Sequence, residues 1–191
     1  MKILNILEIT NKDYSGQPIA NRYFAQRIEQ YATNIDKTRV FYSYQLLKES
    51  LKILSLDLDK LVINTTEDGK PFFEDETLNL FFSITHNKNY VATILADYPV
   101  GIDIQILTKL NTKVANRFFS AKVCKKIAKS NCPDKLFTEE WTKYESRKKI
   151  FGNNSSMRDY NKKIKLKLFH MKDQNKNKYY LCVASIKKHF A

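Results

Sequence analysis

The sequence has few glycines, few cysteines and no long apolar run, and each shortage excludes a class of protein. Only four glycines occur among 191 residues, so the glycine-rich loops of P-loop and dinucleotide-binding proteins are absent. The three cysteines are far apart and none forms a C-x-x-C pair, which argues against a disulfide framework and against a zinc site. No apolar run reaches the roughly eighteen residues of a membrane span.

The opening segment MKILNILEIT meets the charged Glu8 too early for a secretory signal. With neither a signal nor a membrane span, we expect a cytoplasmic protein. The length of 191 residues and the hydrophobic share of 43% suit one compact domain, or two small halves with a common core.

A strongly basic composition is the clearest signal that is present. The formal net charge is +13. The segment from Trp141 onward contains fourteen Lys and Arg and three acids, so a net charge of +11 lies in the last quarter of the chain. This excess indicates an anionic partner: nucleic acid, a membrane surface, an acidic protein or a phosphate-rich small molecule.

The periodicity of apolar residues predicts an α+β fold. Strands are expected at 2–9, 78–85, 90–98, 99–105, 163–170 and 179–189, and helices at 19–31, 37–54, 111–118, 121–130 and 135–151. Asp36 is the expected N-cap of the second helix, EDGKPFF has turn chemistry, and 151–161 is the best candidate for a mobile loop.

Helical segments followed by a strand pair occur on both sides of Tyr98. This repetition predicts two related α+β lobes in one chain, 1–98 and 99–191.

The segment PVGIDIQ places an acid in the middle of an apolar strand. Val100, Ile102 and Ile104 share one face, so Asp103 and Gln105 share the other with Gly101. Asp103 is then either a solvent-facing acid at a strand edge or part of a site.

The segment WTKYESRKK places Trp141, Glu145 and Lys149 along one side of a helix. The simpler interpretation is an exposed Glu–Lys pair one turn apart. The apolar start of this face at Phe137 and Trp141 favours instead a position at the edge of the core. Together with Asp103, Glu145 would supply the one or two carboxylates that Mg²⁺ takes from proteins.

His86 follows Thr85 at the end of a predicted strand. It is either an ordinary structural histidine or, with the Thr85 hydroxyl and Lys70, part of a set of donors for a phosphate group.

The ordered segments GKP, FSITH, VGIDIQ and WTKYESRKK resemble the 4′-phosphopantetheinyl transferases, especially the two-lobed surfactin-synthetase-activating type. The resemblance covers roughly 69–152, and a weaker similarity occurs in DKTRVFYSYQLLK. It implies two pseudo-symmetric α+β lobes with coenzyme A and Mg²⁺ in the cleft between them. It also implies transfer of the phosphopantetheine arm of coenzyme A to a serine of an acyl or peptidyl carrier protein, with release of adenosine 3′,5′-bisphosphate.

Site residues carried over from the resemblance fall into three groups. Asp103, Glu145 and Gln105 occupy the metal-ligand positions, although Gln105 stands where the family usually has Glu, which leaves open whether the metal is Mg²⁺ or Mn²⁺. Lys149 would contact the phosphates, and either Glu145 or Lys149 would remove the serine proton. The resemblance also implies contacts to the nucleotide of coenzyme A from Lys70, Pro71, Thr85, His86 and Arg39. Tyr144 replaces the usual Lys before Glu145.

The partner implied by the resemblance is an acidic carrier protein from fatty-acid, polyketide or peptide synthesis, which the basic chain would attract. Two lobes in one chain make a monomer sufficient, with no membrane partner. One alternative is a basic nucleic-acid-binding module, although no helix-turn-helix, zinc-finger or RNP-type segment occurs. Another is a Mg²⁺-dependent transferase of the same fold that uses a different phosphate donor.

Overall fold

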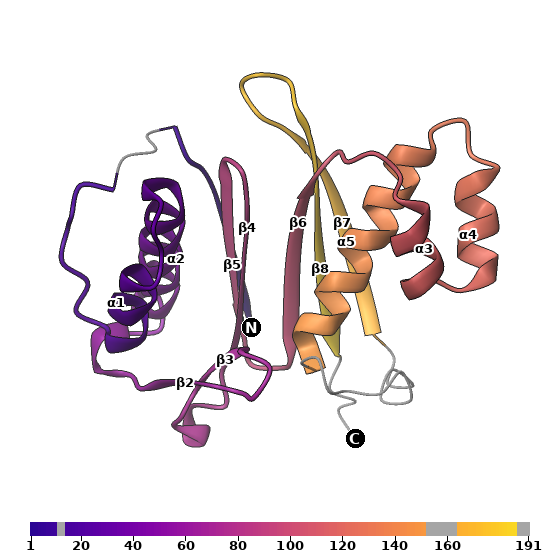
Figure 1. Ribbon diagram of the computed structural model, residues 1–191. Coiled ribbons are helices and arrows are strands. Elements are labelled where there is room, and N and C mark those ends of the chain that lie inside the picture. The colour runs from indigo at the N-terminus through magenta and orange to yellow at the C-terminus, as the bar shows by residue number, and fades with distance from the viewer. Residues whose placement is uncertain (11–13, 152–163, 187–191) are drawn as a thin grey trace.

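Residues 1–10, 14–151 and 164–186 are described by the computed structural model of this chain (Figure 1). They form helices and small antiparallel sheets, in agreement with the predicted α+β class. The α-helices are α1 (Arg22–Glu29), α2 (Asn34–Lys52), α3 (Thr112–Phe118), α4 (Ala121–Ala128) and α5 (Pro133–Phe151). The strands are β1 (Lys2–Glu8), β2 (Ile63–Thr65), β3 (Pro71–Phe73), β4 (Phe81–Asn87), β5 (Tyr90–Ala96), β6 (Val100–Ile106), β7 (Ile164–Lys172) and β8 (Lys178–Ile186). No helix within these ranges combines the length and the apolar character needed to cross a membrane.

The two three-stranded sheets have the same topology. Their strand orders are β1-β5-β4 and β6-β8-β7, so in each sheet the strand that comes last in the chain lies in the middle. All pairings within these two sheets are antiparallel. The division into lobes 1–98 and 99–191 would follow this repetition along the chain, and it stays a prediction.

Helices lie on the outer side of each sheet (Figure 1). A first core joins α1 and α2 to one face of β5 and includes Leu47, Leu51 and Leu95. A second core joins the other face of β5 to β6 and β8 and includes Ile94 and Ile102. Because both faces of β5 are covered, its sequence is a nearly continuous apolar run.

The predicted strands and helices are present, with shifts at their ends. The prediction for Asp36 is wrong: α2 begins at Asn34, three residues earlier than expected, and its N-cap is Thr33, whose hydroxyl oxygen accepts from the Asp36 N–H. Asp36 lies in the first turn, where a carboxylate stabilises the helix dipole. The segment expected as a turn also contributes β3, which pairs with β2. Apart from Phe151 at the end of α5, the loop predicted for 151–161 lies outside the described residues.

The two large sheets meet where β4 lies along β6. The backbone N–H groups of Ile102 and Ile104 donate to the side-chain oxygens of Ser83 and Thr85, each at 3.2 Å. Side chains of β4 therefore satisfy the open edge of β6, which would otherwise expose unpaired donors. This contact brings the motif FSITH beside the motif VGIDIQ.

Gly101 allows α5 to lie directly on β6. A Cβ atom at this position would stand 2.1 Å from the backbone oxygen of Ser146 and 3.0 Å from the backbone nitrogen of Ile150. The backbone of α5 thus fills the space beside Gly101. The glycine acts on the site indirectly, by setting the distance between α5 and Asp103.

We expect Gly101→Ala to lower the free energy of unfolding by about 3 kcal/mol, because a methyl group in contact with helix backbone forces α5 outward. Urea denaturation measures this change. A suitable control is Gly69→Ala, which has nothing within 4 Å of the added Cβ but a φ of +82°; it should cost only about 1–2 kcal/mol from backbone strain. Equal stability of wild type and Gly101→Ala would contradict the proposed role of this contact.

Candidate active site

A pocket of about 380 Å³ lies where α1, α2, β4, β6 and α5 converge. Its lining draws on every segment that sequence reasoning singled out between 69 and 152. The predicted site residues that line it are Lys70, Pro71, Thr85, His86, Asp103, Glu145 and Lys149, whereas Gln105 and Arg39 are not part of the lining. Residues distant in sequence are thus brought to one concave site, the arrangement typical of a ligand-binding pocket.

Asp103 is the most constrained charged group of the pocket. The residue is only 4% exposed, so the interpretation of Asp103 as a solvent-facing acid is wrong. Its Oδ1 accepts from the Lys149 ammonium at 2.9 Å and from the Thr85 hydroxyl at 3.2 Å, and its Oδ2 accepts from the Gln105 amide at 2.8 Å. A carboxylate removed from water requires such partners, and here they come from β4, β6 and α5.

The Thr85 hydroxyl is occupied within this network. Its oxygen accepts the Ile104 N–H, and its proton is donated to Asp103. Thr85 is buried, at 3% exposure, so in this arrangement it holds the Asp103 carboxylate in place.

Glu145 lies one helical turn before Lys149 on α5, yet Lys149 forms its ion pair with Asp103. Burial, and after it the nearby Asp103 charge, raises the pKa of Glu145, although Lys148 and Lys149 act in the opposite direction. The Asp103 charge therefore disfavours the ionised form of Glu145, an effect that a bound cation would relieve.

Lys70 links the β2–β3 hairpin to the end of α5. Its ammonium donates to the Ile150 carbonyl at 2.7 Å, where the negative end of the helix dipole favours a cation. Burial lowers the pKa of Lys70 to about 8. The pocket therefore contains a partly desolvated cation that an anionic ligand would stabilise.

His86 lines the pocket with part of its side chain open to solvent. Burial of the ring, and then the positive charges of Arg39 and Lys149, lower the pKa of His86 to about 4. Solvent contact weakens the effect of burial, but the shift has the same direction and the imidazole is neutral at pH 7. A neutral imidazole with one N–H can donate to a phosphate oxygen.

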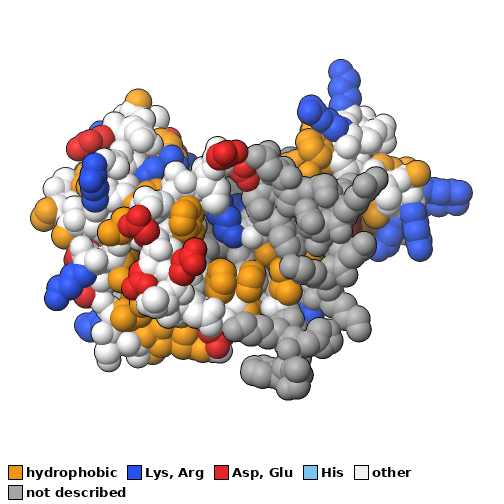
Figure 2. Space-filling view, turned by 90° about the horizontal axis from the view of Figure 1, so that it is seen from below, with side chains coloured by type: hydrophobic (Ala, Val, Ile, Leu, Met, Phe, Trp, Pro, Cys, Tyr) orange, Lys and Arg blue, Asp and Glu red, His pale blue; other side chains and the backbone are white. Residues whose placement is uncertain are grey.

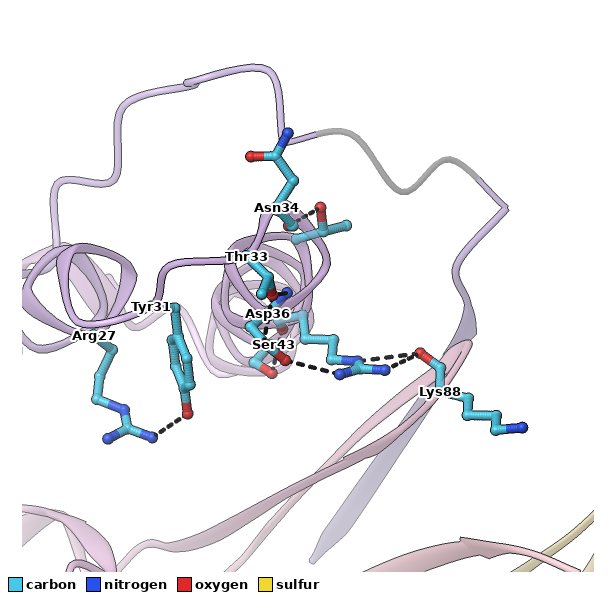
Figure 3. A network of polar contacts seen from close by, with 9 residues as sticks. Arg27, Tyr31, Thr33, Asn34, Asp36, Ser43 and Lys88 are labelled. Carbon is cyan, nitrogen blue, oxygen red and sulfur yellow. Dashed lines mark hydrogen bonds and ion pairs between the residues drawn. The ribbon is translucent and has the colours of Figure 1, made fainter.

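Arg39 takes part in a separate network at the start of α2. Its guanidinium donates to the Asp36 carboxylate at 2.8 Å and twice to the Lys88 carbonyl, at 2.8 and 3.1 Å. Figure 3 shows this network, with Asp36 on α2 on one side of the guanidinium and Lys88, in the turn after β4, on the other. Arg39 thus ties α2 to the β4–β5 hairpin beside the pocket.

Sequence reasoning missed four residues that line the pocket: Tyr23, Arg27, Tyr31 and Lys148. Arg27 donates to the Tyr31 hydroxyl at 2.8 Å and lies 5.2 Å from the centre of its ring; both are labelled in Figure 3. No motif marks Tyr23, Arg27 and Tyr31, because this stretch reads in sequence as an ordinary amphipathic helix. Only the folded arrangement, in which α1 packs on α2 beside the pocket, reveals these three residues. Lys148 lies within WTKYESRKK, where sequence reasoning assigned it no role.

Tyr144, which replaces the lysine of the family pattern, belongs to an aromatic cluster outside the pocket lining. Its ring stacks on Trp141 at 5.5 Å between centroids and contacts Phe118 at 5.3 Å. The side chain therefore joins α3 to α5 and supplies no cation to the pocket.

Among the predicted site residues that line the pocket, Asp103 and Glu145 are the carboxylates that could hold a divalent cation. Hard cations such as Mg²⁺ accept one or two carboxylates together with water and phosphate oxygens, so this pair fits. A larger group does not form: within 1–10, 14–151 and 164–186, no three His, Cys, Asp or Glu side chains converge in a way that could hold a metal ion.

Charge is divided unevenly between the two halves of the chain. Residues 1–98 carry 11 Lys and Arg against 13 acids, whereas residues 99–191 carry 22 against 7. Figure 2 shows acidic side chains gathered on the side of β2 and β3, and Lys and Arg side chains at the opposite end, where α3 and α4 lie. The segment 108–132, which contains both helices, has seven basic residues and no acid.

Two curated proteins match this chain at modest identity. The 4′-phosphopantetheinyl transferase gsp of Aneurinibacillus migulanus is 27% identical over 130 residues, which cover 66% of this chain and 54% of that protein. The 4′-phosphopantetheinyl transferase psf-1 of Bacillus pumilus is 28% identical over 94 residues, which cover 49% of this chain and 40% of that protein. The chain therefore spans about half the length or less of these curated relatives. No protein-family model matches it.

These matches confirm the resemblance that the four motifs predict. Both relatives are named as transferases of the phosphopantetheinyl group, in agreement with the prediction of an enzyme.

The lowered pKa of Lys70 predicts a specific dependence of stability on pH. Between about 8 and the ordinary value of 10.5, the unfolded chain keeps the Lys70 proton while the folded protein releases it. The contribution of Lys70 to the free energy of unfolding therefore rises with pH across this window. We expect the stability of wild type minus that of Lys70→Met to increase from pH 7 to pH 10 in urea denaturation.

Lys60→Met is the matched control, because Lys60 is exposed and its removal should leave the pH dependence unchanged. Parallel curves for wild type and Lys70→Met would show that Lys70 is not desolvated in solution.

Proposed function

We propose that this chain, as a relative of the 4′-phosphopantetheinyl transferases, moves the phosphopantetheine arm of coenzyme A to a serine hydroxyl of an acyl or peptidyl carrier protein. The serine oxygen forms a bond to the β-phosphorus of coenzyme A, the pyrophosphate bond breaks, and adenosine 3′,5′-bisphosphate leaves. The reaction would take place at the pocket between α1, β4 and α5, with one lobe on either side of it.

One observation carries the proposal: a single pocket is lined by residues from all four motifs that resemble the family. Lys70 comes from GKP, Thr85 and His86 from FSITH, Asp103 from VGIDIQ, and Glu145 with Lys149 from WTKYESRKK. The two curated relatives support the same group transfer.

The cationic and aromatic groups of the pocket suit a nucleotide with several phosphates. We assign Lys70 and His86 to the phosphates of the adenosine part, because both line the pocket and both are donors. Pro71 would line the base, together with Tyr23 and Tyr31, whose rings could stack on it. Lys149 would contact the pyrophosphate.

Asp103 and Glu145 would hold the divalent cation, Mg²⁺ or Mn²⁺. When bound, the metal would neutralise charge on the pyrophosphate and orient it for attack. The residues of the chain would then fix the in-line geometry, since Asp103 is held by Thr85 and Lys149 and cannot turn freely.

We assign the removal of the serine proton to Glu145, directly or through a water molecule. A general base must be unprotonated and have a free lone pair, and its effectiveness rises as its pKa approaches the working pH. Glu145 has free lone pairs, because no described side chain donates to its carboxylate. The Lys149 ammonium, by contrast, is paired with Asp103.

The carrier protein would approach the basic half of the chain. The segment 108–132 offers seven positive charges without an acid, and an acidic partner would be steered towards it. We expect this association to weaken as the salt concentration rises.

Two alternative functions, a nucleic-acid-binding module and a transferase that uses a different phosphate donor, receive less support. Neither curated relative is named as a nucleic-acid-binding protein, and the lysines of β7 are separated along the strand by half-buried apolar residues, as in a solvated strand edge. A different phosphate donor would use the same pocket, and only a direct assay distinguishes it.

Intact-mass spectrometry tests the proposed function. An apo carrier protein incubated with this protein, coenzyme A and Mg²⁺ should gain the mass of one phosphopantetheine arm, and EDTA should prevent the gain. Asp103→Ala and Glu145→Ala should each slow the transfer by about 1000-fold, because the charge stabilisation that a metal supplies amounts to several kcal/mol.

Glu140→Ala is the matched control on the same helix, because Glu140 lies outside the pocket lining and pairs with Lys143. Near-normal transfer by both pocket variants would disprove the metal assignment. No mass gain on several unrelated carriers, combined with no binding of coenzyme A, would disprove the function itself.

A further inference from the structure

We infer that Asn87 and Gln105 act as a positioning pair for the Asp103 carboxylate, and that the Gln105 oxygen does not ligate the metal. The metal would then be held by two protein carboxylates. The inference rests on the proposed function for the presence of a metal, whereas the contacts of the pair are independent of it.

The orientation of the Gln105 amide follows from its two neighbours. Its Nε2 lies 2.8 Å from Asp103 Oδ2, and its Oε1 lies 3.1 Å from Asn87 Nδ2. An ionised carboxylate only accepts hydrogen bonds, so the group facing Asp103 must be the NH₂ of the amide. The oxygen is consequently directed to Asn87, away from Asp103.

The pair spans the contact between the two sheets. Asn87 ends β4, and Gln105 lies near the end of β6, two residues after Asp103. The chain of donors therefore runs from Asn87 to Gln105 and from Gln105 to Asp103. Only one orientation of the Gln105 amide satisfies both of these hydrogen bonds.

Both oxygens of Asp103 are thereby fixed from separate elements. Thr85 and Lys149 donate to Oδ1 from β4 and α5, while Gln105 donates to Oδ2. For Gln105 to offer its oxygen to a metal, the amide would have to turn over. That turn breaks both amide hydrogen bonds and brings the amide oxygen against the Asp103 carboxylate.

Gln105 also lies outside the pocket lining, whereas Asp103 and Glu145 are part of it. A second carboxylate at position 105 could ligate a cation directly, but in the absence of metal it would repel Asp103 and could not donate to it. The amide therefore stabilises the metal-free pocket and leaves one more coordination position to water or phosphate. Fewer charged ligands mean weaker metal binding.

The test measures metal binding directly, without a carrier protein. Wild type, Gln105→Glu and Asn87→Ala are titrated with Mn²⁺ by electron paramagnetic resonance, with and without coenzyme A, and water-proton relaxation counts the water molecules on the bound ion. Melting temperatures are recorded in EDTA. Asn64→Ala, an exposed amide on β2, is the matched control.

Gln105→Glu should melt at a lower temperature in EDTA, bind Mn²⁺ about tenfold more tightly, and leave one water fewer on the ion, because the added charge becomes a ligand. Asn87→Ala should weaken Mn²⁺ binding by about tenfold, the effect expected on loss of an outer-shell partner, and it remains informative if Gln105→Glu does not fold. Asn64→Ala should match wild type.

Unchanged affinity and unchanged hydration of Mn²⁺ in Gln105→Glu would overturn the inference while leaving the proposed metal site intact. Wild-type affinity in Asn87→Ala would also overturn it. If wild type binds no Mn²⁺ under either condition, the metal part of the proposed function fails together with the inference.

Discussion

The contact between β4 and β6 determines the geometry of everything around the pocket. The two strands belong to different sheets, and side-chain oxygens of Ser83 and Thr85 replace the backbone ladder between them. Because a hydroxyl both accepts and donates, Thr85 can accept the Ile104 N–H and still donate to Asp103. One residue thus joins the sheets and holds the carboxylate. A continuous backbone ladder would hold the strands equally well but would offer no donor to Asp103.

The site is assembled at some expense to the stability of the fold. Lys70 and Glu145 have pKa values shifted towards their neutral forms, chiefly by burial. Asp103 is nearly inaccessible and depends on Lys149 and Gln105 for compensation. Groups held in this way are poorly solvated before a ligand arrives, so an anionic ligand and a cation would gain interactions that water does not already supply. Strained electrostatics of this kind is typical of functional sites.

Much of the fold could be predicted from the sequence, since strong periodicity located the large strands and the five α-helices described. The errors have physical causes. Thr33 caps α2 because its hydroxyl reaches the Asp36 N–H, which spacing alone does not reveal. The short strands β2 and β3 carry few residues and little alternation. The backbone of α5 approaches Gly101 closely, and the strand pattern around position 101 does not indicate this contact because the helix is distant in sequence.

Site residues could be predicted from the sequence only where they lie within short motifs. Positions such as Arg27, Tyr31 and Asn87 lie in segments without a pattern, and the packing of α1 and the meeting of β4 with β6 bring them into use. The two departures from the family pattern illustrate the same principle. Tyr144 is accommodated by Phe118 and Trp141, and Gln105 is accommodated by Asn87. Phe118 and Asn87 are distant in sequence from the residues that they contact, so each substitution looks like the loss of a charged group when it is considered alone. In the folded protein the Gln105 amide donates a hydrogen bond to Asp103, which an ionised carboxylate at position 105 could not do. The amide thereby keeps Asp103 in position in the absence of metal.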